Sequence, residues 1–493
     1  MSFELETAPH PENLRRVAID PVSRVEGHGK VTIQLDEHNQ VSQARLHIVE
    51  FRGFERFIQG RPYWEVPVMV QRLCGICPVS HHLAASKAMD MMLGVTLTPT
   101  AEKLRRLMHH GQILQSHALH FFHLASPDLL FGFGSDVAAR NIVGVVAAAP
   151  ETAKKGVLLR KYGQEVIRLT AGKRVHGTGS VPGGVNKSLS AEERDYLLKD
   201  IYQMVAWSRE AVQMIRGLFE KNLAEYNAFG RFRAHGMGLV APSGAMDLYD
   251  GGLRARDADG RILFDHFDCD RYWDVIAEGV KPWSYMKFPY FKKLGADEGW
   301  YRVGPLTRVT NCDFIPTPLA DRERQEFLAF DGGSATGATL GYHWARMIEM
   351  LHAAETIKDL LHDDDLLGKD LMAADGQRQE RGVGVIEAPR GTLIHHYRVN
   401  ENDEVIRANL IVSTTHNNQA MNESIRQVAR QYLDGNEVTE GLLNHIEVAI
   451  RCFDPCLSCA THALGQMPLE VTLVDADGKV LDHKMRNDAA CCT

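Results

Sequence analysis

The chain lacks the features that would place it in several large protein classes. It has no apolar run of about 18 residues, the length that a membrane helix needs, and its start, Met1 to Glu6, has no basic stretch followed by an apolar one. Basic residues are in deficit: 55 lysines and arginines against 63 acidic residues give a formal charge of −8. These absences predict a cytoplasmic protein with no membrane span and no general affinity for nucleic acid.

Cysteine is also scarce, with nine residues in 493. Five of them have no neighbour at metal-binding spacing and lie scattered or at the end of the chain: Cys269, Cys312, Cys452, Cys491 and Cys492. This pattern fits a reducing compartment better than a disulfide framework, and it offers no local ligand set for an iron–sulfur cluster. The glycine-rich segments 177–179 and 182–184 do not form a dinucleotide-binding fingerprint. Electron transfer to or from this chain would therefore need cofactors on another chain.

The other four cysteines form two Cys-x-x-Cys pairs, Cys74/Cys77 and Cys456/Cys459, whose first members are 382 positions apart (456 minus 74). Thiolates select soft or borderline transition metals, and a site built from both ends of a long chain must lie at the centre of the fold. Structural zinc is the commonest use of four cysteines, but zinc knuckles close short loops. A four-iron cluster usually draws three cysteines from one segment. A redox dithiol needs a neighbouring βαβ pattern, whereas the first pair lies in a predicted helix.

Hydrophobic periodicity predicts an α+β fold that is predominantly helical, with a central helical core and small peripheral β-elements. Alternation from Lys30 to Glu50 predicts a β-hairpin, and residues 392–399 and 405–412 read as strands. Apolar residues recur at intervals of three and four positions in six segments, which predicts helices at 68–93, 101–124, 191–226, 343–361, 417–432 and 439–452. Thr100 is the expected N-cap of the second helix.

The residues that flank the cysteine pairs carry a family resemblance. Arg72-x-Cys74-Gly75-x-Cys77-x-x-x-His81 and Asp454-Pro455-Cys456-x-x-Cys459-x-x-His462 resemble the two signatures that hold the active site in the large subunit of nickel–iron hydrogenases. Blocks 24–28, 51–55 and 387–391 match the same family in order. Blocks 180–186 and 456–468 are similar to its soluble, NAD-reducing (bidirectional) branch. The resemblance covers nearly the whole chain and implies the large-subunit fold.

This resemblance implies a nickel–iron centre that cleaves H2 reversibly and heterolytically, which requires a Lewis acid for the hydride and a base for the proton. Cys74 and Cys456 would be terminal nickel ligands, and Cys77 and Cys459 would bridge nickel to an iron that carries CO and cyanide. Electrons would pass to an iron–sulfur small subunit, then on to flavin- and iron–sulfur-containing diaphorase subunits, which hold FMN and bind NAD+.

The resemblance also assigns roles around the metals. Glu26 corresponds to the acid that relays protons from a nickel-bound thiolate; without the resemblance, it reads as a turn residue before the hairpin. Arg390, fixed by Pro389, corresponds to a guanidinium above the metals, and Asp128 and Asp454 to carboxylates near that arginine.

Further residues complete the implied site. Ser413 and Thr414 match positions that hydrogen-bond a cyanide ligand, and His81 would hydrogen-bond a bridging sulfur from the helical face that it shares with Cys77. A magnesium site would use Glu55, His462 and the backbone carbonyl of Leu410, completed by water.

The last 31 residues (493 minus 462) follow the motif histidine. The resemblance implies a single catalytic domain, residues 1–462, and an extension, residues 463–493, that a maturation endopeptidase removes. Residues 469–475 read as a strand before the turn signal Asp477-Gly478, so an ordinary hairpin retained in the mature protein is the alternative. Three other functions stay open: a hydrogenase large subunit linked to NADP or a deazaflavin, a non-catalytic homologue, and a zinc-stabilised binding protein.

Overall fold

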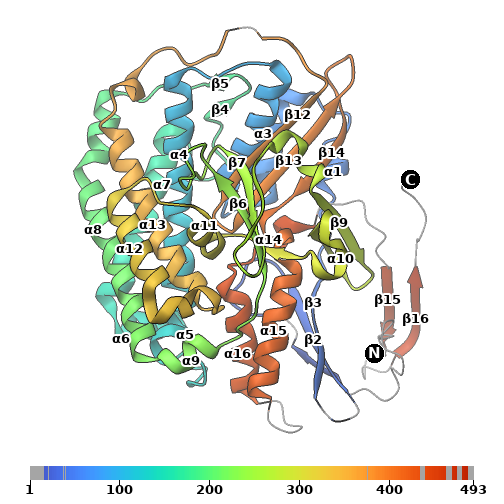
Figure 1. Cartoon of the computed structure of the whole chain (residues 1–493). Helices are drawn as coiled ribbons and strands as arrows, with labels where there is room; N and C mark the ends of the chain where they lie inside the picture. The colour runs from blue at the N-terminus through green and yellow to red at the C-terminus, as the bar shows by residue number, and fades with distance from the viewer. Residues whose placement is uncertain are drawn as a thin grey trace.

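Long helices fill one half of the molecule (Figure 1). The computed structural model describes residues 22–36, 38, 40–374, 376–433 and 439–461, together with the backbone of residues 16–19, 469–474 and 480–486. The helix α13 (Gly341–Leu361) is buried on nearly all sides because it packs against α4 (Pro99–Leu119), α8 (Ala191–Lys221), α11 (Pro305–Asn311) and α12 (Pro318–Ala329). Its apolar side chains therefore form the centre of the largest hydrophobic core.

Other helices extend this body. The helix α7 (Pro150–Ala171) packs on α4, and α15 (Asn418–Tyr432) pairs with α16 (Glu440–Cys452). The remaining α-helices are α1 (Phe54–Phe57), α2 (Val66–Met69), α3 (Pro78–Leu93), α5 (Ser126–Phe131), α6 (Ile142–Ala148), α9 (Leu223–Ala228), α10 (Gly295–Glu298) and α14 (Ser413–His416). No helix among the described residues combines the length and the apolar character needed to cross a membrane.

Small sheets occupy the other side of the body (Figure 1). Two have three strands: β1 (Arg16–Ile19), β2 (Gly29–Leu35) and β3 (Val41–Ile48); and β12 (Arg381–Ala388), β13 (Gly391–Val399) and β14 (Val405–Ile411). A four-stranded sheet has the order β11 (Tyr301–Arg302), β6 (His235–Val240), β7 (Gly252–Arg256) and β8 (Ile262–Phe267). The two-stranded sheets are β4 (Ser180–Val181) with β5 (Gly184–Val185), β9 (Ile276–Lys281) with β10 (Ser284–Phe291), and β15 (Leu469–Val474) with β16 (Val480–Arg486).

The predicted α+β class, the hairpin and the positions of the long helices are confirmed. Two helix starts were wrong. The helix expected from residue 101 has its N-cap at Thr98, whose side chain accepts the N–H of Ala101, and Pro99 takes the first helical position. The helix expected from residue 68 is broken before Pro78.

Strand β12 lies directly on helix α3, and a glycine makes this contact possible. A Cβ atom on Gly384 would come 1.9 Å from the carbonyl oxygen of Ala84, so only glycine allows the two backbones to approach so closely. The contact fixes the hairpin of β12 and β13 relative to the segment that carries the first cysteine pair.

The two ends of the described chain meet at the same place. Glu26 forms a parallel bridge with Cys456, and the N–H of Leu457 donates to the carbonyl of Glu26 at 3.0 Å. Gly27 has a positive φ of 81°, and a Cβ there would lie 2.7 Å from the backbone nitrogen of Ser458. The N-terminal segment is therefore held against the second cysteine pair.

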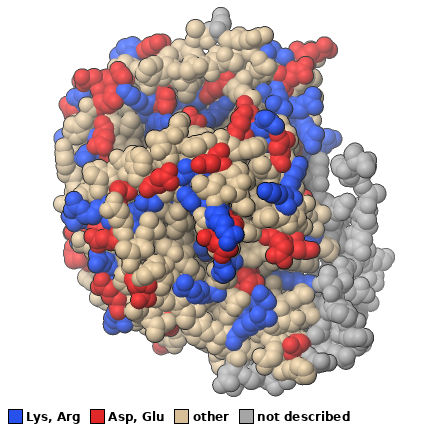
Figure 2. Space-filling view, viewed as in Figure 1, with Lys and Arg blue, Asp and Glu red and all other residues tan. Residues whose placement is uncertain are grey.

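Charged side chains are mixed over the face of the molecule shown in Figure 2, where acidic and basic groups alternate without a broad field of one sign. This mixture agrees with the nearly balanced composition of the chain.

Candidate metal centre

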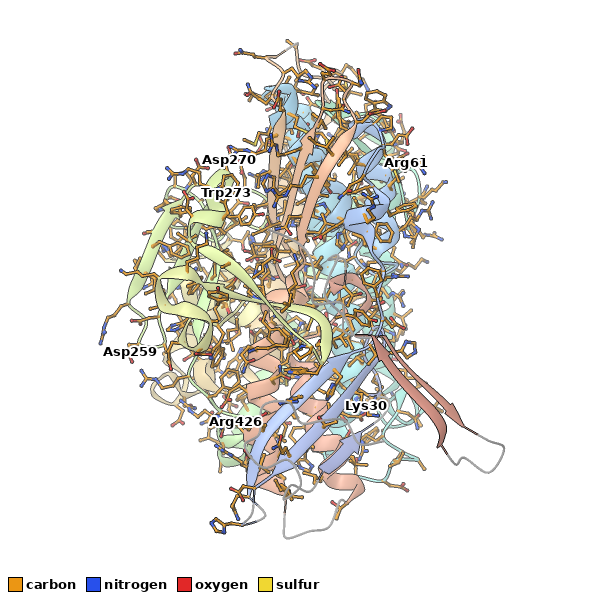
Figure 3. The ribbon with its side chains drawn as sticks, turned by 90° about the vertical axis from the view of Figure 1, so that its right-hand side faces the viewer. Lys30, Arg61, Asp259, Asp270, Trp273 and Arg426 are labelled. Atoms are coloured by element: carbon orange, nitrogen blue, oxygen red, sulfur yellow. The ribbon has the colours of Figure 1, made fainter. Side chains whose placement is uncertain are left out.

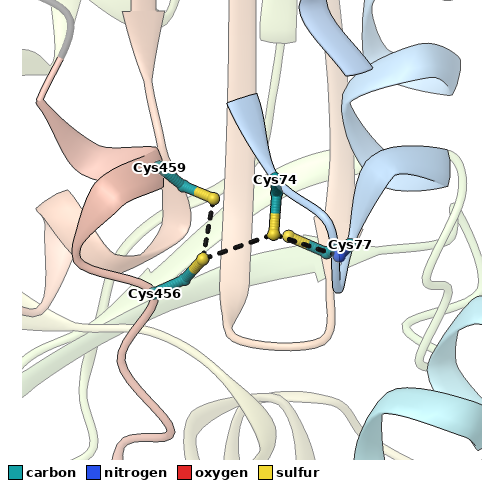
Figure 4. A group of neighbouring side chains, drawn as sticks. All are labelled: Cys74, Cys77, Cys456 and Cys459. Carbon is teal, nitrogen blue, oxygen red and sulfur yellow. Dashed lines mark hydrogen bonds between the residues drawn. The ribbon is translucent and has the colours of Figure 1, made fainter. Parts of the chain in front are cut away.

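The four paired cysteines come together inside the molecule (Figure 4). Cys74 and Cys77 lie between η3 (Val70–Leu73) and α3, and Cys456 and Cys459 lie in the turn at η9 (Ser458–Ala460). The Sγ atoms all lie within 4.8 Å of one another, with 3.4 Å between Cys74 and Cys456. All four side chains are buried. The two distant pairs thus form one cluster that is able to bind a metal.

The first pair lies in a turn rather than in the expected helix. Proline disfavours helical geometry in the residue before it, so Cys77 becomes the N-cap of α3 (φ −118°, ψ 41°) ahead of Pro78. Cys74 is extended, and its Sγ accepts the N–H groups of Ile76 at 3.2 Å and Cys77 at 3.1 Å. His81, in the first turn of α3, still reaches the same pocket as Cys77.

Side chains that the sequence motifs did not identify hold this turn in place. Gln112 and Gln115 of α4 donate to the carbonyl of Ile76 at 2.9 and 2.8 Å, and His176 hydrogen-bonds the carbonyl of Cys74 at 3.2 Å. The only local signal for the glutamines is their spacing of three, which places both on one face of a helix.

Burial and mutual hydrogen bonding shift the pKa values of the thiols in opposite directions. Hydrogen bonds from Cys456, Cys459 and Cys74 hold the pKa of Cys77 well below the ordinary value of a thiol. Burial raises the pKa of Cys456 and of Cys459. The cluster thus favours a thiolate at Cys77, and a bound cation is the natural replacement for the protons on the other cysteines.

Glu26 reaches the cluster from the N-terminal segment. Its Oε2 atom accepts hydrogen bonds from Cys456 Sγ at 3.0 Å and from the N–H of Ser458 at 3.2 Å. The hydroxyl of Ser458 donates to the other carboxylate oxygen. Because the side chain is half-buried, the carboxylate connects a cluster thiol with the outer part of the molecule. Ser458 was not singled out from the sequence, although it lies inside the second Cys-x-x-Cys pair.

Arg390 is held on another side of the cluster by a tight hairpin turn. Ala388 pairs with Gly391, so Pro389 and Arg390 are the two turn residues. The guanidinium donates from Nε to the carbonyl of Asp454 at 2.6 Å and from Nη2 to its carboxylate at 3.2 Å. Burial opposes the charge, yet Asp454 and the nearby cysteines hold the pKa of Arg390 well above its ordinary value.

The third guanidinium nitrogen of Arg390 is available to bind a ligand. Nη1 is buried and has no hydrogen-bond partner among the described residues. Arg390 borders the internal pocket that Cys77, Cys456 and Cys459 also line. A buried donor without a partner is costly, so Nη1 is available for a small acceptor bound beside the cysteines.

The structure separates the two predicted aspartates. Asp454 contacts Arg390 as expected, and burial raises the pKa of its carboxyl. Asp128, which was expected near the same arginine, binds Arg24 at 2.6 Å and Arg451 at 3.0 Å. Arg24 lies two residues before Glu26 in a left-handed conformation with φ 52°, so Asp128 anchors the segment that presents Glu26.

His81 is fixed by a buried chain of hydrogen bonds. Its Nδ1 atom lies 3.1 Å from Nε2 of His395, and Nδ1 of His395 lies 2.6 Å from the hydroxyl of Tyr397. A hydrogen bond from His81 also contributes to the lowered pKa of Cys77. The chain orients the imidazole toward the sulfur, as outer groups do at metal sites. His395 and Tyr397 were not among the predicted site residues.

Ser413 and Thr414 lie at the pocket, in a short helix that follows strand β14. Strand β14 ends at Ile411, and residues 413–416 form α14. The hydroxyl of Ser413 donates to the carbonyl of Gly391 at 2.7 Å, whereas Thr414 Oγ1 accepts the N–H of Cys456 at 3.0 Å. Thr414 therefore keeps its hydroxyl proton for another acceptor.

Glu55 and Leu410 also lie together. The N–H of Leu410 donates to Glu55 Oε1 at 2.8 Å, and the Nζ atom of Lys287 is 3.8 Å away from the same oxygen. Burial raises the pKa of Glu55, so the carboxylate favours a nearby cation. The third member of the expected magnesium set, His462, lies outside the described residues.

The molecule has a helical core and a buried thiol cluster with a carboxylate and a guanidinium beside it. This combination is typical of redox metalloenzymes. Two family models match the sequence: one described as HoxL-like over residues 16–51, and one described as nickel-dependent hydrogenase over residues 52–133 and 265–462. The chain belongs to the nickel-dependent hydrogenase family, which confirms the resemblance read from its motifs.

Individual relatives agree with this assignment. The chain is 49% identical to the NAD-reducing hydrogenase HoxS subunit beta of Cupriavidus necator, over 96% of this chain and all of the relative. It is 45% identical to a subunit of the F420-non-reducing hydrogenase vhu of Methanocaldococcus jannaschii, over 84% of this chain and 99% of the relative. A solved structure of an NAD+-reducing [NiFe]-hydrogenase in the H2-reduced state is 60% identical, with a TM-score of 0.89, and covers 91% of this chain and 99% of that one.

The residues at the cluster fit a nickel-containing group. Four cysteine sulfurs within one buried cluster are a soft donor set that suits nickel and iron. Nη1 of Arg390 and the hydroxyl of Thr414 add two donors for small acceptor ligands in the same pocket.

Proposed function

We propose that this chain is the catalytic subunit of a soluble hydrogenase that splits H2 reversibly and heterolytically. The observation that carries the proposal is the four-cysteine cluster with Glu26 hydrogen-bonded to Cys456. A thiolate cluster supplies metal ligands, and an adjacent carboxylate supplies the base that heterolytic cleavage needs.

Cys74 and Cys456 would hold nickel as terminal ligands, and Cys77 and Cys459 would bridge nickel to an iron that carries CO and cyanide. When bound, this metal pair supplies the Lewis acidity that polarises dihydrogen. The closeness of the four sulfurs, all within 4.8 Å of one another, supports a shared site for two metals. Arg390 and Thr414 would donate to the small ligands on the iron.

Proton movement falls to the chain itself. The hydroxyl and N–H of Ser458 hold the Glu26 carboxylate in place before the transfer. The Cys456 sulfur can then release its proton to Oε2 of Glu26, 3.0 Å away, which leaves Glu26 as a neutral carboxyl group that passes the proton on. Asp128 supports this transfer indirectly because it fixes Arg24 and thereby the position of Glu26. Arg390 stays charged throughout and keeps a positive field on the cluster.

A magnesium ion is proposed at Glu55, the carbonyl of Leu410 and His462. The contact between Glu55 and the Leu410 backbone supports the pairing of the first two. A hard ion of this kind prefers oxygen ligands and retains part of its water, which suits a carboxylate beside a backbone carbonyl.

Electrons would leave through other subunits, since the described cysteines form no second group with metal-binding geometry. We propose an iron–sulfur small subunit, together with a diaphorase that carries FMN and further iron–sulfur clusters and reduces NAD+. Gly75 is exposed in the loop that carries Cys74 and Cys77, so the cluster comes close to the surface there, and the small subunit would dock over it. The proposed compartment is the cytoplasm.

The choice of NAD+ rests on similarity to the C. necator relative and to the solved NAD+-reducing enzyme. Purified complex is expected to reduce NAD+ with H2 as the only electron donor, measured by the absorbance of NADH. Reduction of NADP+ or a deazaflavin without NAD+ would favour the second candidate, a hydrogenase of similar build with another acceptor. Its support is the 45% identity to an archaeal F420-non-reducing hydrogenase subunit.

We further propose that residues 463–493 are removed during maturation by an endopeptidase that cuts after His462. The strands β15 and β16 pair as a hairpin in this extension, in agreement with the strand expected at 469–475. The expected turn at Asp477-Gly478 lies outside the described residues. Mass spectrometry of active enzyme is expected to find a large subunit that ends at His462. Active enzyme that ends at Thr493 would identify the hairpin as part of the mature protein.

A further inference from the structure

Three arginines stand side by side across the β12–β14 sheet. In the antiparallel register, Arg381 pairs with Arg398, and Arg398 pairs with Arg407. Residues directly opposite one another point to the same face, with Cβ atoms about 4.5–5.5 Å apart, and like charges in such positions destabilise a sheet. This arginine row (Arg381, Arg398 and Arg407) is therefore a cost to the fold that needs an explanation.

The arginine row lines a cleft of about 1370 Å³. The opposite wall includes Trp273 of η5 (Cys269–Asp274) and residues of β9. Figure 3 shows Trp273 and Asp270 on the opposite side of the sheet from Arg61 in that view. The described residues that line this cleft include none of those that line the pocket at the cysteine cluster.

Carboxylates near the cleft neutralise the row only in part: Asp270 interacts electrostatically with Arg381, and Glu55 with Arg407. Glu380 is the carboxylate paired with Arg398, at 4.0 Å, and its side chain is 71% exposed. Deeper in the cleft, Glu55 and Glu278 are engaged by Lys287, at 3.8 and 3.0 Å. Arg381 lies over the ring of Trp273, 4.7 Å from its centroid, which offsets only part of its charge.

The sheet face becomes less polar from the row inward. The next position along the strands holds the pair His396 and Asn409, and the pair Ile394 and Ile411 behind it is buried. The Nε2 atom of His396 is buried and has no partner among the described residues. Burial, together with the field of the arginine row, lowers the pKa of His396 to about 4. The imidazole is therefore neutral at physiological pH and offers one hydrogen bond inside the cleft.

We propose that this cleft binds an organic phosphate with at least two phosphate charges, such as a nucleoside diphosphate. The phosphates would lie on the arginine row, where guanidinium groups can form paired hydrogen bonds with their oxygens. The uncharged body would extend toward His396 and Asn409. The volume of the cleft and the position of His396 and Asn409 behind the row favour such a ligand over an acidic protein segment, which would contact only the exposed row. Hydrogen splitting at the cysteine cluster does not depend on this site.

The test is calorimetric titration of the full-length chain, purified without partners, with pyrophosphate and with ADP. Both are expected to bind saturably. Arg398→Gln should weaken both at least about tenfold, because it removes the central charge-assisted contact. His396→Ala should weaken ADP but not pyrophosphate. The matched control is Arg271→Gln, which removes an exposed arginine of η5 paired with Asp274 and should change neither affinity.

Folding of the variant is checked in the same samples. Arg398→Gln should melt no lower than the parent chain, since the substitution removes repulsion between like charges. The proposal is overturned if neither phosphate binds at millimolar concentration, or if Arg398→Gln binds as tightly as the parent. Saturable binding of a polyglutamate peptide without binding of the phosphates would also overturn it and assign the row to an acidic protein partner.

Discussion

Replacing Cys459 by serine is expected to abolish hydrogenase activity and to leave the chain without its metal pair. The side chain is fully buried, and its Sγ lies 2.7 Å from that of Cys456, at the centre of the cluster. A serine hydroxyl is a hard donor that stays protonated at neutral pH, so it cannot replace a bridging thiolate. Metal analysis of the purified variant should find nickel and iron far below the parent ratio.

The control for this experiment is Cys312→Ser. Cys312 is also buried, but its sulfur contacts the carbonyl of Val309, at 3.8 Å, and the side chain of Arg324. This variant should keep both metals and most of its activity, although burial of a hydroxyl in an apolar site costs about 1–3 kcal/mol of stability. Nickel and iron at the parent ratio in Cys459→Ser would refute the bridging role.

Glu26→Gln is expected to lower hydrogen/deuterium exchange by about two to four orders of magnitude while the metals remain in place. Glutamine keeps the shape of the side chain but cannot take the proton of the Cys456 thiol, which now lies 3.0 Å from the carboxylate. Because the metals are held by the cysteines, metal content should be unchanged. The measurement is the rate of HD formation from D2 in water.

Two further variants test whether the loss of exchange comes from the Glu26 carboxylate itself. Ser458→Ala removes the hydroxyl that donates to Glu26 but leaves the carboxylate, so exchange should fall less than in Glu26→Gln. Glu65→Gln changes an exposed acid at the end of η2 (Tyr63–Glu65) and should leave the rate unchanged. Exchange at the parent rate in Glu26→Gln would remove this carboxylate from the proton route.

The sequence was most informative where a chemical motif fixes the geometry. The cysteine pairs and their flanking blocks predicted a single central site, and the ends of the chain do meet there through Glu26 and Cys456. The break before α3 was also readable, because Pro78 disfavours a helical Cys77, but apolar periodicity across residues 68–93 hid it. The same reasoning at Pro99 would have placed the N-cap at Thr98.

Contacts between distant segments could not be read from the chain. Asp128 was expected to lie near Arg390, and the structure shows that it binds Arg24 and Arg451, which are 104 and 323 positions away. Such pairings depend on how α5 and α16 pack, which no local pattern specifies. His395 is another case: its role depends on the register between β13 and α3 that brings it to His81.

Infrared spectroscopy combined with metal analysis of the purified, active complex tests the central claim most directly. The account predicts nickel and iron bound to this chain, together with absorption bands from one or more metal-bound CO and cyanide ligands that shift when H2 is added. Four-coordinate zinc at the cysteine cluster, without nickel and without CO or cyanide bands, would contradict it.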